Sequence, residues 1–168
     1  SSGAYAAAGC LSASLGYSAI NPRKLPPSIA VVLWLPEEAA LNSTALHARV
    51  GPILPAVQRV LMATDAGVSP PSAIFVVDAS PLIPSGASAS EVIDKEATAG
   101  QLGKQLGKPV GRLLEKLLCG YTGSVCLVGI EGGASLALDL LQAPPAQRGI
   151  REGVVDRVVL LKPKLSAA

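Results

Sequence analysis

The sequence contains four short runs of apolar residues, separated by segments with helical patterns. Each run is four to eight residues long and rich in Val, Ile and Leu, as expected for strands that are buried on both faces. Strands that alternate with helical segments are typical of a parallel sheet. The sequence therefore predicts an α/β fold with three layers: a mostly parallel sheet of about four strands with helices on both faces. The runs are residues 29–35, 73–77, 125–128 and 154–161.

The helical patterns are recognised by apolar residues at three- and four-residue steps and by their boundary residues. Ser88 and Glu91 have the spacing of a capping box, which predicts a helix that begins there. The segment 91–118 contains too many glycines for one regular helix, so we expect a break near Gly107. The expected helices are 46–63, with its start nearer Pro55, one that begins after Ser88, 109–118, and 134–142.

The composition sets limits on the kind of molecule. With 168 residues, 49% of them hydrophobic and 15% charged, the chain can bury the core of one domain, which excludes global disorder. Its net charge of +2 is too balanced for a protein that mainly neutralises phosphates, so we expect no nucleic-acid partner. The strongest apolar run, 29–35, is far shorter than the ~20 residues of a membrane-spanning helix, and no transmembrane segment is expected.

The N-terminal stretch differs from the rest. Its first 36 residues contain no acid, are rich in Ser and Ala, and carry Arg23 and Lys24 as their only charged side chains. This pattern fits the remnant of an organelle import sequence, which would indicate a mitochondrion or, alternatively, a plastid. A flexible low-complexity arm explains it equally well. We therefore divide the chain into an arm, 1–25, and a domain, 26–168.

The most specific residues follow the third predicted strand. The strand runs directly into residues 129–133, Gly-Ile-Glu-Gly-Gly, and then into the helical pattern of 134–142. A strand, a sharp turn flanked by glycines and a helix form the layout of the nucleophile elbow, whose pattern is G-x-S-x-G. Gly129 and Gly133 match both glycines of that pattern, Gly132 is also small, and Glu131 occupies the place of the serine.

These features give residues 29–163 a resemblance to the central part of the α/β-hydrolase family. The resemblance lies in the order of the elements and in four local stretches. If it holds, the strands lie in the spatial order second, first, third, fourth, and 73–77 and 154–161 form the two edges. The arm could then cover one edge or reach a neighbouring subunit, and a partner protein could cover the other. The four stretches are 34–36, 76–78 with the Ser/Gly/Pro-rich loop after it, 127–133 and 156–161.

The chain departs from the family at the residues that would perform catalysis. A serine hydrolase needs a hydroxyl nucleophile, an acid and a histidine, in that order along the chain. The histidine takes the proton of the hydroxyl, and the acid orients the histidine. Glu131 has no hydroxyl, and the single histidine, His47, lies upstream of it. Some members of the family use an aspartate at this position to form an ester intermediate, but that chemistry still needs a downstream histidine to activate water. Glutamate is one methylene longer than aspartate, which displaces its oxygen from the position of attack. We therefore assign no catalytic residue. Glu131 is then interpreted as a carboxylate near a helix N-terminus, where the helix dipole favours it, with no catalytic role.

With these departures, the resemblance implies a protein that is not an enzyme. We expect a catalytically inactive structural or accessory subunit of a larger, organellar protein complex, which acts through protein–protein contacts. The alternative is an esterase or thioesterase fragment of the serine-hydrolase type, whose acid and histidine lie outside this chain. A longer native chain with a downstream histidine would favour the enzyme, whereas a stable stoichiometric complex would favour the subunit.

No cofactor or metal is expected. The turn at 129–134 matches neither G-x-G-x-x-G nor the P-loop, and Glu131 would repel a phosphate. The three cysteines contain no C-x-x-C pair, and one histidine cannot complete a metal site. We expect Cys119 and Cys126 to be small core residues rather than a redox pair.

One charged pattern remains. Four basic residues follow one another at four-residue steps, which predicts a solvated helix face. Such a face could meet an acidic partner. These residues are Lys104, Lys108, Arg112 and Lys116.

Overall fold

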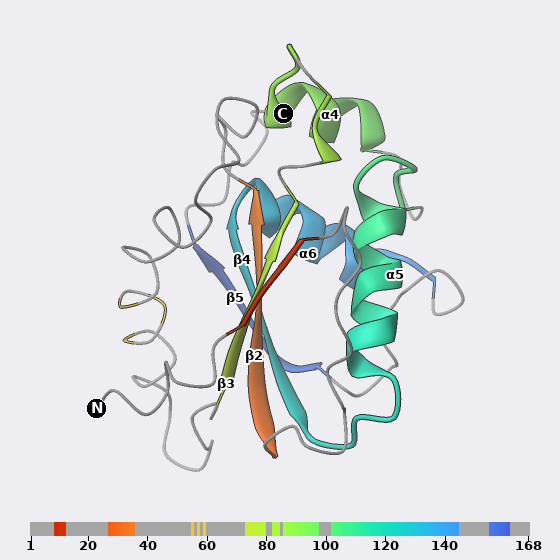
Figure 1. Ribbon diagram of the computed structural model, residues 1–168. Coiled ribbons are helices and arrows are strands. Elements are labelled where there is room, and N and C mark those ends of the chain that lie inside the picture. The colour runs from red at the N-terminus through yellow and green to blue at the C-terminus, as the bar shows by residue number, and fades with distance from the viewer. Residues whose placement is uncertain are drawn as a thin grey trace.

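A five-stranded, all-parallel sheet forms the centre of the molecule, in the order β1-β3-β2-β4-β5 (Figure 1). The computed structural model describes residues 9–12, 27–35, 55, 57, 59, 73–79, 82–84, 86–97, 102–144 and 155–161. The four predicted strands are all present and lie in the predicted order, so the α/β prediction is confirmed. The strands are β1 (Gly9–Ser12), β2 (Ser28–Leu35), β3 (Ala73–Asp78), β4 (Ser124–Glu131) and β5 (Val155–Leu161).

The first strand was not predicted as a strand, although the expectation that the arm could cover one edge of the sheet is confirmed. β1 comes from the segment interpreted as an arm, and it pairs with β3 from Gly9 opposite Phe75 to Ser12 opposite Asp78. The prediction that 73–77 forms an edge of the sheet is therefore wrong, because β1 lies outside it. The segment has no apolar run that would mark a strand, and β1 is only four residues long. Its partner β3, with four consecutive buried residues, supplies the template.

Among the described residues, the helices with defined ends are α4 (Ala89–Glu96), α5 (Gly107–Leu118) and α6 (Gly132–Gln142). The capping box of α4 is confirmed, because the Glu91 N–H donates to Ser88 Oγ at 3.2 Å and the Ser88 N–H donates to Glu91 Oε2 at 3.5 Å. The break before α5 is also confirmed, although α5 begins two residues before the expected 109. Of the predicted helix 46–63, residues 55, 57 and 59 are described and are helical; the others lie outside the described residues.

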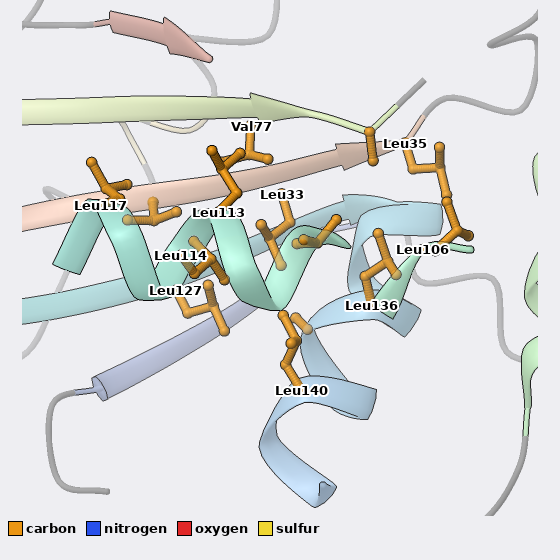
Figure 2. Packing of buried hydrophobic residues seen from close by; sticks show 14 of the residues in the cluster. Leu33, Leu35, Val77, Leu106, Leu113, Leu114, Leu117, Leu127, Leu136 and Leu140 are labelled. Carbon is orange, nitrogen blue, oxygen red and sulfur yellow. The ribbon is translucent and has the colours of Figure 1, made fainter. Parts of the chain in front are cut away.

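Among the described residues, the core consists of two clusters, one on each face of the sheet. Alternate residues of β2 point to opposite faces, so Leu33 belongs to the first cluster and Val32 to the second. In the first cluster, leucines of α5 and α6 pack against the sheet, and Figure 2 shows Leu114 and Leu140 beside Leu127. In the second, Val57 from the helical segment packs against the sheet, which completes the third layer.

A side chain at the end of α4 binds the backbone at the start of α5. The Glu96 carboxylate accepts hydrogen bonds from the Leu106 backbone N–H, with oxygen distances of 2.9 and 3.0 Å, and from the Gln105 N–H. Leu106 is the N-cap of α5 and cannot cap the helix itself. Glu96 thus supplies a distant cap for α5, and its negative charge lies at the positive end of the helix dipole. A Cβ at Gly103 would overlap the Glu96 side chain, so this residue must be small.

Among the described residues, no helix combines the length and apolar character that crossing a membrane requires.

Candidate functional site

The predicted elbow lies at the centre of the sheet, where β4 ends and α6 begins. Glu131 is the last residue of β4 and the N-cap of α6, and it is in register with Leu35 at the end of β2. On the other side of β2, the Ala79 N–H donates to the Trp34 carbonyl at 3.1 Å. The carboxyl ends of three neighbouring strands therefore meet here, which is where open α/β sheets place their sites.

The backbone at Glu131 has the conformation that a sharp strand-to-helix turn requires. Its φ of 55° and ψ of −121° make it the single non-glycine residue with positive φ in the described part of the chain. A side chain in such a conformation costs roughly 1 to 3 kcal/mol and persists only where the surroundings enforce it. The sequence predicted this turn from glycine spacing alone.

The surroundings that enforce the turn are three close approaches of backbone to backbone. A Cβ on Gly129 would lie 2.6 Å from Ala134 Cα, and one on Gly132 would lie 2.8 Å from the Leu35 carbonyl oxygen. A Cβ on Gly133 would overlap the Leu33 carbonyl. No side chain fits at these positions, so the three glycines fix α6 against β2 and β4.

The chemistry of this turn is that of a carboxylate beside a helix N-terminus. Glu131 is half-buried, and the positive end of the α6 dipole favours its negative charge. The same charge repels a phosphate or carboxylate ligand from the amides of that helix end. The structure thus brings together Gly129, Glu131, Gly132 and Gly133, while His47 lies outside the described residues.

Within the described segments, no group of three or more His, Cys, Asp or Glu side chains is arranged to hold a metal ion. The cysteine prediction is half correct. Cys126 is buried in the second cluster, but Cys119 is exposed, because it follows the last residue of α5 and lies outside its apolar stripe.

Sequence reasoning missed one contact between neighbouring strands. The Arg157 Nε–H of β5 donates to Cys126 Sγ of β4 at 3.3 Å, and Arg157 Nη1 is buried without a partner among the described residues. Burial raises the pKa of the Cys126 thiol, although Arg157 acts in the opposite direction. The thiol is therefore protonated and unreactive at neutral pH. An irregularity between Val125 and Cys126 sets this pairing, and no sequence signal indicates it.

Acidic groups also approach one another outside the elbow. Burial, and to a smaller extent the charge of Glu96, raises the pKa of Asp139 above its usual 3.8. Asp139 lies on α6, so this effect links α6 to the α4–α5 junction. It lies eight residues beyond Glu131 along the chain, and it forms part of no three-residue cluster among the described residues.

Comparison with protein-family models, with curated proteins and with solved structures found no match to the chain. The class of protein that the fold defines is therefore the parallel, three-layer α/β class, with its candidate site at the carboxyl end of the central strands.

Proposed function

We propose that this protein is a catalytically inactive, α/β-hydrolase-like structural or accessory subunit that acts through protein–protein contacts in a larger assembly. One observation carries the proposal: the elbow backbone is complete, with positive φ at Glu131 between Gly129 and Gly133, but its side chain is a carboxylate. A fold that keeps the turn and lacks the hydroxyl retains the architecture without the serine nucleophile. We further propose that the assembly is mitochondrial or, alternatively, in a plastid, from the acid-free N-terminal stretch.

The shape of the sheet supports contacts with other proteins. β5 is an outer strand, its first four residues alternate between half-buried and exposed, and Val158 is 38% exposed. It is the single exposed large hydrophobic side chain among the described residues. Outer strands present backbone donors and acceptors that proteins usually cover or pair.

Ester hydrolysis tests the inactive part of the proposal. We expect no turnover of a p-nitrophenyl ester above the buffer rate by the wild-type protein, nor by Glu131→Ser, because no histidine follows position 131 in this sequence and a serine without a base is a weak nucleophile. Glu131→Ala is the matched control, since it removes the carboxylate and adds no hydroxyl. Turnover by Glu131→Ser but not by Glu131→Ala would contradict the proposal and favour the esterase alternative.

Native mass tests the assembly part. We expect the protein, extracted gently from its source and separated under native conditions, to migrate with other proteins at fixed stoichiometry. Peptide identification of the band would then name the partners. Migration near its own 16.9 kDa would count against a subunit role.

A further inference from the structure

The outer face of α5 is a basic row made of three residues. Lys108, Arg112 and Lys116 follow at four-residue steps, which corresponds to a rise of about 6 Å from one to the next, and all three are exposed. Lys104, in the turn just before the helix, is exposed as well. The predicted helix face is thus present, except that Lys104 precedes the helix.

The opposite face of α5 fixes the direction in which this row points. Leu113, Leu114 and Leu117 are buried against the sheet, as Figure 2 shows, and the Glu96 cap holds the N-terminal end of the helix. A helix anchored on one face and at one end cannot rotate about its axis. The backbone positions that carry the basic row are therefore fixed on the outer face of the helix.

This row concentrates the charge of the molecule. The segment 104–116 contains four basic residues and one acid, Glu115, so its net charge of +3 exceeds the +2 of the whole chain. The remainder of the protein is slightly negative. Such a local excess steers an oppositely charged partner to one place on the surface.

We propose that the basic row on α5 docks an acidic helical segment of a partner protein, with acidic side chains at matching four-residue steps. This inference rests on the proposed function and specifies the chemistry of one partner surface. Two observations favour a protein over a membrane or a nucleic acid. Glu115 is exposed beside the row and would oppose a uniformly negative surface, and α5 has no exposed large apolar side chain to enter a lipid layer.

The test uses the full chain and a fluorescent helical peptide, about four turns long, with Glu at every fourth position on an Ala/Gln background. A peptide of the same composition with scrambled Glu positions is the spacing control. We expect the regular peptide to bind more tightly than the scrambled one. We also expect binding to weaken strongly as the salt concentration rises to about 0.5 M, where surface charges are screened.

Two double variants isolate the row. Lys108→Gln/Arg112→Gln should weaken binding of the regular peptide by roughly two- to thirtyfold, the range expected for two exposed ion pairs. Arg59→Gln/Lys95→Gln removes the same charge from exposed positions elsewhere and should leave the affinity unchanged. Circular dichroism checks that both variants are folded. Equal losses in the two variants, or equal binding of the two peptides, would overturn the proposal.

A label on Cys119 locates the bound peptide. Cys119 is exposed directly after α5, whereas Cys126 is buried, so a fluorophore attached in a Cys10→Ser background reports on the end of the row. The regular peptide, carrying a quencher, should reduce this fluorescence in proportion to binding. Binding without quenching would place the peptide elsewhere and overturn the proposal.

Parallel titrations with phosphatidylserine vesicles and with duplex DNA test the other partners. Tighter binding to either of them than to the regular peptide, lost in Lys108→Gln/Arg112→Gln, would overturn the acidic-helix proposal in favour of that surface. The native-mass experiment tests the proposed function independently of this inference. If native co-migration persists in Lys108→Gln/Arg112→Gln and the regular peptide does not bind, the subunit proposal stands and this inference is wrong.

Discussion

The elbow and the α4–α5 junction both lead into a helix, but they are held by opposite means. At the elbow, Gly129 and Gly133 have no side chains, and backbone lies directly against backbone. At the junction, the Glu96 side chain reaches back to the amides that begin α5. The first connection is fixed by steric exclusion, and the second is fixed by charge and hydrogen bonding.

This difference has a consequence for how each region responds to change. Steric exclusion between backbone atoms cannot relax, because the strands on both sides are buried. A hydrogen-bonded carboxylate can be replaced in part by water or by a neutral acceptor. We therefore expect the three elbow glycines to tolerate almost no substitution, and we expect substitutions at the junction to cause smaller, graded losses of stability.

The largest expected effect is at Gly133. Gly133→Val should destabilise the protein by more than about 4 kcal/mol, or prevent folding, because its Cβ would overlap the Leu33 carbonyl in the centre of the sheet. Urea unfolding followed by circular dichroism measures this loss. Gly120→Ala is the control, since that Cβ meets open space and only the positive φ of 74° costs about 1 kcal/mol. Similar losses in both variants would show that the elbow is not tightly packed.

The junction should respond less. Glu96→Ala removes the acceptor for two backbone amides and should lower the free energy of unfolding by about 1 to 3 kcal/mol. Glu96→Gln should cause a smaller loss, because the glutamine amide keeps one acceptor oxygen. Asp94→Ala, an exposed acid on the same helix, should have almost no effect. Hydrogen exchange of the Leu106 amide gives a local readout. Unchanged protection of that amide in Glu96→Ala would mean that Glu96 does not cap α5.

The contrast also explains which parts could be predicted. The elbow follows from local spacing, since Gly129, Glu131 and Gly133 lie within five residues and each glycine has a steric reason. The capping box at Ser88 and Glu91 is local in the same way, and the sequence predicted it correctly. Glu96 acts on an amide ten residues further along the chain, and no periodic pattern connects the two.

No local sequence pattern marks two further features. β1 forms because β3 offers it a pairing edge, and its own four residues have no distinct strand pattern. The Arg157–Cys126 contact depends on a register irregularity between β4 and β5. The resemblance to the α/β-hydrolases predicted the order of the central strands, while the assignment of the chain to that family remains a proposal.

A pair of variants separates backbone strain from side-chain contacts at the elbow. Both Glu131→Gly and Glu131→Ala remove the carboxylate, but only glycine relieves the positive φ. We expect the glycine variant to be more stable by about 1 kcal/mol, the reverse of the usual order of these residues at a helical position. Thermal and urea unfolding compare the two. A more stable alanine variant would mean that Glu131 is not held in a strained conformation.

The smallest effect is expected at Asp139. Because burial raises its pKa above 3.8 in the folded protein, the folded state binds this proton more tightly than the unfolded state. The stability that this proton contributes is present below pH 3.8 and is lost as the pH rises through the higher folded value. Asp139→Asn should therefore gain a few tenths of a kcal/mol at neutral pH, a small amount because solvent screens this half-exposed group.

Urea unfolding at several pH values tests this sign. The stability gained by Asp139→Asn should shrink as the pH falls toward 3.8 and below. Glu96→Gln should also reduce the pH dependence of stability that Asp139 causes, since it removes the neighbouring charge that helps to raise the pKa of Asp139. A gain that grows in acid would contradict the assignment.

The order of the strands also determines when the protein can fold during its synthesis. β2 lies between β3 and β4, and its Ser28 is opposite Ser124, which the ribosome adds about a hundred residues later. At ~5 to 20 residues per second, that interval lasts roughly 5 to 20 seconds. During it, the most apolar strand of the chain leaves the ribosome without one of its two neighbours. A chaperone that binds β2 in this interval would raise the yield of native protein, and its absence would favour aggregation.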